Sequence, residues 1–397
     1  RHNDLIDIKK QLNWLGYGNI TVTAYFGEFM EKRVKKFQAD HGLPINGIID
    51  EKTKNTINTK YNQIFQEGGR HESIKTVKRM LNAVGFGHIQ VTSLYGSFMT
   101  KKVKEFQSYY GLNVTGKLDL NTLDELEKIY QSPLQKGKSH PKVAELKENL
   151  SRLGFGNFKG NNNFGSLTEK HLKDFQRYYG LKVTGIADSK TLEKIDDLLG
   201  SPLQKGKHHE VLIRIKKQLN WLGYGNIIVT TYFGDFMEKR VKKFQADHGL
   251  PVNGIIDEKT KNTINAKYNQ IFQEGGRHES IKTVKRMLNA VGFGHIQVTS
   301  LYGSFMTKKV KEFQSYYGLN VTGKLDLNTL DELEKIYQSP LQKGKSHPKV
   351  AELKENLSRL GFGNFKGNNN FGSLTEKHLK DFQRYYGLKV TGIADSR

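Results

Sequence analysis

The chain has 397 residues, a formal net charge of +23 and 36% hydrophobic residues, a low fraction for one large core. It has no cysteine, which excludes disulfide scaffolds, zinc–thiolate sites and cysteine nucleophiles. No apolar run approaches the roughly 18 residues of a membrane helix, so we expect no membrane insertion.

The sequence repeats every 69 residues. A Phe-Gln pair marks each repeat, at Phe37, Phe106, Phe175, Phe244, Phe313 and Phe382. A second period of 207 residues lies above the first, since residues 1–190 match residues 208–397 at all but ten positions. The chain therefore contains three types of repeat, A, B and C, and this A-B-C series occurs twice. The repeats are A1 (1–69), B1 (70–138), C1 (139–207), A2 (208–276), B2 (277–345) and C2 (346–397).

The first helix expected in repeat A covers about residues 4–15. Leu5, Ile8 and Leu12 recur at the spacing of one helical face, and Gly16 can end the helix in a left-handed conformation. The second helix is expected over residues 27–41, where Met30 and Val34 begin the apolar stripe.

The third helix expected in repeat A covers about residues 51–65. Asp50 is suited to cap its N-terminus, and Ile57 and Ile64 would point inward. Repeated every 69 residues, these elements predict an all-α chain of six tandem three-helix orthogonal bundles. The short linkers 132–137 and 201–206 contain Pro and Gly, and we expect them to hold neighbouring repeats in a fixed relation. Repeats of different type should differ mainly in the loop after their first helix, which reads differently at 19–23 and at 157–161.

Repeat C2 stops before its third helix, which in repeat C1 would occupy residues 191–199. We interpret the chain as one segment of a longer repetitive protein. A unit without this helix should not hold its shape alone, because each lost core side chain costs roughly 2–5 kcal/mol. We therefore expect further polypeptide or a neighbouring copy to complete the core around Leu353, Leu360 and Phe382.

Repeat C carries a recognisable set of residues. It combines Leu153-Gly154-Phe155-Gly156, Phe164-Gly165, Phe175-Gln176 and Gly180-Leu181 with Asp188. This pattern resembles the peptidoglycan-binding-like domain of bacterial cell-wall hydrolases, a three-helix family, and the resemblance covers all six repeats. Repeats A and B differ in having Met30 and Met99 where repeat C has Thr168. The resemblance implies attachment to wall glycan or stem peptide.

Two groups of residues are candidates for binding. Lysines on the second helix form a basic stripe that would attract anionic wall polymers, although single lysines are more often a solvated surface. The lysines of this stripe are Lys35, Lys36, Lys104, Lys173, Lys242, Lys243, Lys311 and Lys380. Tyrosine pairs end the second helix in repeats B and C, and they could stack on sugar rings or pack against the next repeat. The pairs are Tyr109 and Tyr110, Tyr178 and Tyr179, Tyr316 and Tyr317, and Tyr385 and Tyr386.

Histidine recurs just before the first helix of every repeat, from His2 to His347. We interpret it as a local hydrogen bond that organises the helix start, with a ligand or pH-sensitive contact as the alternative. No metal-ligand spacing or catalytic constellation stands out, so we expect no cofactor, no metal and no enzymatic activity.

The sequence leaves three functions open. The leading prediction is a secreted, non-catalytic protein that binds peptidoglycan or an associated anionic wall polymer through many weak sites. The alternative is a structural subunit of an extracellular fibre or surface layer, in which the partner is a copy of the chain itself. The third is an enzyme whose catalytic domain lies outside this chain. Nucleic acid would suit the charge, but no nucleic-acid-binding motif supports it.

Overall fold

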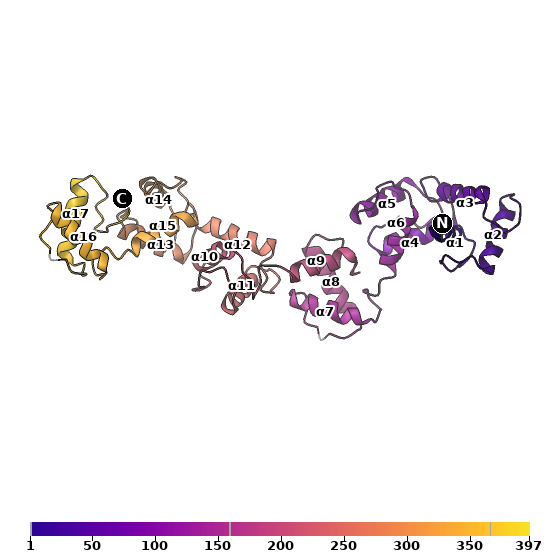
Figure 1. The fold of residues 1–397 in the computed structure, drawn as a ribbon, viewed down its shortest axis with the longest axis horizontal. Coiled ribbons are helices and arrows are strands. Elements are labelled where there is room, and N and C mark those ends of the chain that lie inside the picture. The colour runs from indigo at the N-terminus through magenta and orange to yellow at the C-terminus, as the bar shows by residue number, and fades with distance from the viewer. Residues whose placement is uncertain (1, 159, 366) are drawn as a thin grey trace. The chain divides into compact units, whose positions relative to one another are not determined.

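The computed structural model describes every residue except 1, 159 and 366, and of residues 2 and 3 only the backbone. It divides into two compact halves, Arg1–Gly200 and Ser201–Arg397, each with three repeats (Figure 1). Among the described residues there are 17 α-helices and no strand, which confirms the all-α class. The first half contains α1 (His2–Trp14), α2 (Glu28–Asp40), α3 (Glu51–Ile64), α4 (Glu72–Ala83), α5 (Ser97–Tyr109), α6 (Leu120–Tyr130), α7 (Pro141–Arg152), α8 (Ser166–Tyr178) and α9 (Ser189–Leu199).

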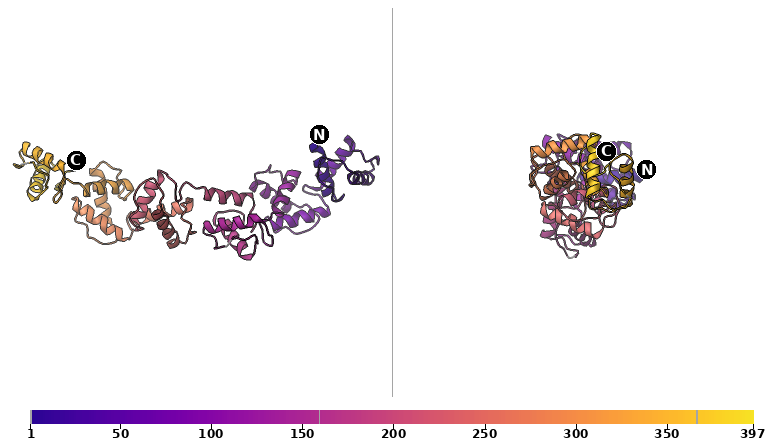
Figure 2. Two further views of the ribbon diagram at one scale, coloured as in Figure 1. Left: turned by 60° about the horizontal axis from the view of Figure 1, so that its bottom comes forward. Right: turned by 90° about the vertical axis from the view of Figure 1, so that its left-hand side faces the viewer.

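The second half repeats this order with one helix fewer. It contains α10 (Val211–Trp221), α11 (Asp235–Asp247), α12 (Glu258–Ile271), α13 (Glu279–Ala290), α14 (Ser304–Tyr316), α15 (Leu327–Tyr337), α16 (Pro348–Arg359) and α17 (Ser373–Tyr385). Apart from the start of α10, each helix begins and ends 207 residues after its counterpart. Helix 1 of a repeat packs on helix 3, as α1 does on α3 and α4 on α6. Two further views show that the ribbon is helical from one end of the colour bar to the other (Figure 2).

An isolated antiparallel bridge joins the segment before helix 1 to the segment before helix 2 in five of the repeats. In repeat B1 Arg70, before helix 1, pairs with Leu94, before helix 2, and the bridge recurs at the same positions in the four repeats that follow. The loop between these helices is held differently in repeat C, whereas repeats A and B share one arrangement, which Asn82 and Ile89 form in B1. In repeat A1 the Asn13 side chain donates to the Ile20 carbonyl and accepts from the Ile20 N–H. In repeat C1 Ser151 instead accepts a hydrogen bond from the Phe158 N–H.

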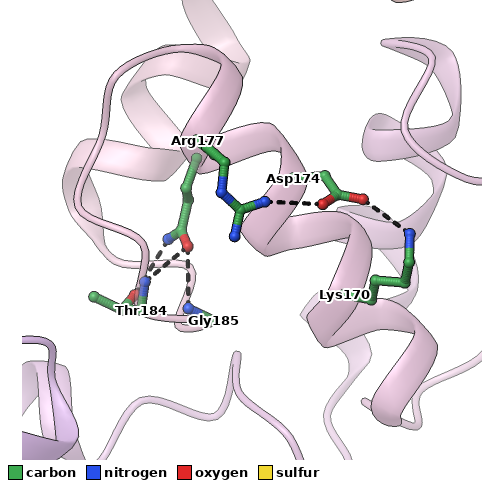
Figure 3. Close-up of polar contacts among 6 residues, drawn as sticks. Lys170, Asp174, Arg177, Thr184 and Gly185 are labelled. Atoms are coloured by element: carbon green, nitrogen blue, oxygen red, sulfur yellow. Dashed lines mark hydrogen bonds and ion pairs between the residues drawn. The ribbon is translucent and has the colours of Figure 1, made fainter.

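The glutamine of each Phe-Gln pair is buried, and its side-chain amide joins three segments of the repeat by hydrogen bonds. We call this set of hydrogen bonds the bracket. The amide nitrogen of Gln176 donates to Thr184, to Thr191 and to the Ile186 carbonyl. Its oxygen accepts from the N–H groups of Thr184 and Gly185 (Figure 3). The bracket ties the end of helix 2 to the following loop and to the first turn of helix 3. Five polar contacts satisfy one side chain that is fully buried, which makes the position intolerant of apolar replacement.

Helix starts are capped as the sequence predicts. Asp50 accepts a hydrogen bond from the Thr53 N–H at 2.8 Å, and the pKa of its carboxyl is lowered mainly by that bond. His71 accepts from the Ser73 N–H at 3.0 Å, and His140 does the same for Lys142. The structural interpretation of the recurring histidine is therefore confirmed for the five whose side chains are described, while the side chain of His2 lies outside the described residues.

Repeats A and B share one core within each half. Apolar side chains of both repeats form a single buried cluster, which in the first half runs from Ile8 to Ile129. The Tyr61 hydroxyl donates to the Leu118 carbonyl at 2.6 Å, and Lys10 and Asp124 form an ion pair at 2.8 Å. The second half repeats both contacts, so A and B behave as one folding block.

Repeat C2 shows what the absent third helix leaves open. Helices α16 and α17 form as in repeat C1, although the sequence argument expects such a unit not to hold its shape alone. Leu360 is 57% exposed, whereas its counterpart Leu153 is fully buried. A pocket of about 230 Å³, lined by Leu353, Leu357 and Phe382 among others, lies where α9 packs in repeat C1.

Candidate binding surfaces

Most of the candidate lysines on helix 2 are paired with carboxylates on the same helix. Lys35 contacts Glu31 at 3.1 Å and Lys36 contacts Asp40 at 2.7 Å. In repeat C1 Asp174 is held between Lys170 and Arg177 (Figure 3). The same pattern pairs Lys173, Lys242, Lys243 and Lys380. These local ion pairs neutralise much of the basic stripe in repeats A and C.

The pKa values of the paired aspartates reflect these contacts. The Lys36 ammonium, with help from the Tyr17 hydroxyl, holds the pKa of Asp40 below its usual value, and Lys170 does the same for Asp174. Both carboxylates therefore stay ionised and keep compensating their lysines well into the acidic range.

Repeat B differs from the other two types. Thr100 stands where repeats A and C have the glutamates Glu31 and Glu169, and within the described part of the chain neither Lys101 nor Lys104 forms an ion pair. Both lysines line an open groove of about 800 Å³ on α5, together with Tyr109 and two glutamates, Glu67 and Glu105, of which Glu105 pairs with Lys102. Repeat B2 carries the same residues, with Lys308 and Lys311 again outside ion pairs in the residues described. Among the described residues, repeat B is thus the type whose candidate lysines on helix 2 form no ion pair, although two glutamates share their groove.

The tyrosine pair of repeat B lies against repeat C. The Tyr109 hydroxyl accepts a hydrogen bond from the Lys182 N–H at 3.0 Å, and the Tyr110 hydroxyl donates to Asp188 at 2.5 Å. Burial and the neighbouring Asp188 carboxylate raise the pKa of Tyr110. Tyr316 and Tyr317 make the same contacts with Lys389 and Asp395 in the second half.

Further contacts of the same joint come from residues that the sequence reasoning did not single out. Ile186 of repeat C1 is buried within the core cluster of repeats A1 and B1. The Lys182 ammonium lies 4.5 Å from the centre of the Phe86 ring. Thr184 approaches Gly85 so closely that a Cβ there would lie 2.8 Å from the threonine methyl group. The available signal was the motif Ile-x-Asp-x-Lys, which repeats A1, C1 and A2 contain, which repeat C2 carries with Arg397 in place of the lysine, and which repeat B lacks.

The tyrosine pairs of repeat C have two different settings. Tyr178 and Tyr179 are half-buried and pack beside Phe155. Tyr385 and Tyr386 are 76% and 53% exposed. Of the two roles considered for these pairs, the contact with the next repeat is the one that the B repeats make.

A further group missed by the sequence reasoning is a half-exposed phenylalanine at the start of helix 2 in repeats A and B. A cation lies over each described ring, with Arg33 4.9 Å from the centre of Phe29 and Lys102 5.4 Å from that of Phe98. The signal was an aromatic residue at constant phase, which repeat C replaces by Leu167.

A family model described as "Putative peptidoglycan binding domain" matches the chain six times in tandem. The matched segments are residues 1–57, 70–126, 139–195, 208–264, 277–333 and 346–397. A comparison with curated proteins gave no match. In the part of the chain that the structure describes, none of the helices has the length and apolarity to cross a bilayer.

Proposed function

The chain belongs to the family of putative peptidoglycan-binding domains, and from this we propose that it is a secreted, non-catalytic protein that attaches to the bacterial cell wall. The observation that carries the proposal is the sixfold tandem match of one binding domain over most of the chain. Repetition multiplies contacts, and several weak sites on one chain bind together with high effective concentration. The ligand is peptidoglycan or an anionic polymer associated with it, outside the cell.

We assign the electrostatic part of this binding to the groove of repeat B1 and to the same residues of repeat B2. Lys101 and Lys104 are exposed and form no ion pair among the described residues, an arrangement suited to an anionic chain. The lysines of repeats A and C contribute less, because an exposed ion pair must be broken before they can contact a new anion.

The test is sedimentation of the chain with purified peptidoglycan, prepared with and without its teichoic acids. The variant with Lys101, Lys104, Lys308 and Lys311 all changed to Ala should bind at least tenfold more weakly. The matched control changes Lys36, Lys243, Lys170 and Lys377, each paired with an aspartate, to Ala and removes the same formal charge. Equal losses in both variants would show that only net charge matters. Unchanged binding in the first variant would exclude the grooves.

A further inference from the structure

Helix 2 of both A repeats carries an arginine that lies over an exposed aromatic ring. In repeat A1 the guanidinium carbon of Arg33 is 4.9 Å from the centre of the Phe29 ring, and in repeat A2 that of Arg240 is 5.4 Å from the centre of the Phe236 ring. Phe29 is 47% exposed and Phe236 is 49% exposed. Because the second copy lies in the middle of the sequence and has the same geometry, the arrangement is a property of repeat type A.

The backbone after helix 1 confines this arginine. Gly18 has a φ of +113°, and a Cβ there would lie 3.1 Å from Arg33 Nε and 3.5 Å from the Phe29 ring. In repeat A2 a Cβ on Gly225 would likewise lie 3.1 Å from the Nε of its arginine. A glycine at this place therefore lets the loop approach the guanidinium closely. A side chain held in this way loses less conformational freedom when it binds a ligand.

The guanidinium has no partner within the protein. Among the described residues neither Arg33 nor Arg240 forms an ion pair or a hydrogen bond, and the Nε of Arg240 is buried without an acceptor. The nearby carboxylate of Glu31 is already engaged by Lys35 at 3.1 Å. An unpaired guanidinium whose Nε is covered keeps its two Nη groups as the donors for a ligand.

The equivalent position is filled differently in the other repeat types. In repeat B1 Lys102 lies over the Phe98 ring but pairs with Glu105 at 3.1 Å. In repeat C1 the position is occupied by His171, which packs edge-on against Phe158 with 5.5 Å between the ring centres. Within the part of the chain that the structure describes, an unpaired guanidinium beside an exposed ring is thus found in type A.

We propose that Arg33 and Arg240 each bind a carboxylate in the peptide part of peptidoglycan, an inference that rests on the proposed function. A guanidinium offers two parallel N–H groups, which match the two oxygens of a carboxylate. The exposed ring beside it suits an aliphatic group next to that carboxylate, which a hydrated phosphate polymer does not offer. The A repeats then recognise the peptide, while the lysines of the B repeats attract anionic polymer by charge.

The first experiment is sedimentation with peptidoglycan freed of teichoic acids, either untreated or with its carboxyl groups converted to amides. The variant Arg33→Lys with Arg240→Lys keeps the charge but loses the paired N–H groups. It should bind untreated peptidoglycan roughly threefold to tenfold more weakly than the wild type. On amidated peptidoglycan the two proteins should bind equally.

The matched control is Arg79→Lys with Arg286→Lys, the same exchange at an exposed arginine of each B repeat. This control should bind untreated peptidoglycan as the wild type does. An equal loss in the control, a loss that persists on amidated peptidoglycan, or undiminished binding of the Arg33 and Arg240 variant would each overturn the proposal.

The second experiment does not depend on wall binding. In a nuclear magnetic resonance titration, N-acetylalanine should shift the guanidinium signals of Arg33 and Arg240 and the ring signals of Phe29, and N-acetylalaninamide should not. Larger shifts with inorganic phosphate, or none with N-acetylalanine, would overturn the choice of a carboxylate. A chain that shows these shifts but does not sediment with peptidoglycan would contradict the proposed function and leave the carboxylate site supported.

Discussion

The glutamine of the Phe-Gln pair is the single residue on which the interior of each repeat depends. Changing Gln107 and Gln314 together to Leu leaves the buried N–H group of Gly116 and the partly buried one of Thr115, and their copies, without their acceptor. We expect a loss of roughly 2–4 kcal/mol per repeat, from buried groups that each cost about 1–3 kcal/mol when unpaired. Hydrogen exchange should show these amides losing protection. Gln90→Leu with Gln297→Leu, at an exposed position, should leave protection unchanged.

Tyr110 and Tyr317 should make stability depend on pH in the alkaline range. Burial and a neighbouring aspartate raise the pKa of both above the unfolded value of about 10. A pKa raised by folding means that the stabilisation is complete below about pH 10 and is lost as the pH rises further. The melting temperature should therefore fall more steeply above pH 10 in the wild type than in the variant with both tyrosines changed to Phe. Parallel curves for the two proteins would show that neither hydroxyl contributes.

Side-chain roles were predictable only where they are local in sequence. The caps formed by Asp50 and His71 follow from a residue type directly before a helix, and the structure confirms both. The bracket made by Gln107 was not predicted, because its partners lie 8 to 15 residues away and come together only when the third helix packs. The role of Tyr110 stayed open for the same reason, since Asp188 is 78 residues distant.

At the scale of elements, α7–α8 and α16–α17 form a comparison within one molecule. Residues 139–189 and 346–396 are identical in sequence, yet α9 covers only the first pair. Local opening should be easier where the third helix is absent. We expect trypsin to cut after Arg359 roughly tenfold or more faster than after Arg152, because opening there exposes less buried surface.

The masses of the large fragments distinguish the two cuts although the local sequences are the same. The identical repeats B1 and B2, which both have three helices, provide the control and should be cut at equal rates. Equal cleavage after Arg152 and Arg359 would mean that the third helix adds little to the stability of the other two.

The helices themselves were predictable because their apolar spacing and glycine stops are repeated six times. The predicted spans 4–15, 27–41 and 51–65 lie within two residues of α1, α2 and α3 at every boundary. What the sequence did not show is that repeats A and B share one core. The shared core depends on Tyr61 and Phe65 of repeat A1, which pack with residues of repeat B1. The periodicity within one repeat does not reveal such contacts.

At the scale of the whole molecule, the net charge of +23 should make wall binding sensitive to salt. The screening length falls from about 8 Å at physiological ionic strength to about 3 Å at 1 M. We expect retention on purified walls to fall steeply over this range, and to fall less in the variant without the four lysines of the B grooves. Retention that is independent of salt would point to stacking by the tyrosines.

The two kinds of joint have a mechanical consequence. Repeats A and B are held by a continuous core, whereas repeat C is held to B by two tyrosine hydroxyls, one isoleucine and a lysine over a ring. Under tension applied to the ends of one half, we therefore expect the B–C joint to part before the shared core of repeats A and B opens. Asp188 also caps α9, so parting the joint leaves the cap in place and the helix ready to dock again. A chain built in this way would lengthen in small reversible steps and absorb a pull on the surface to which it is attached.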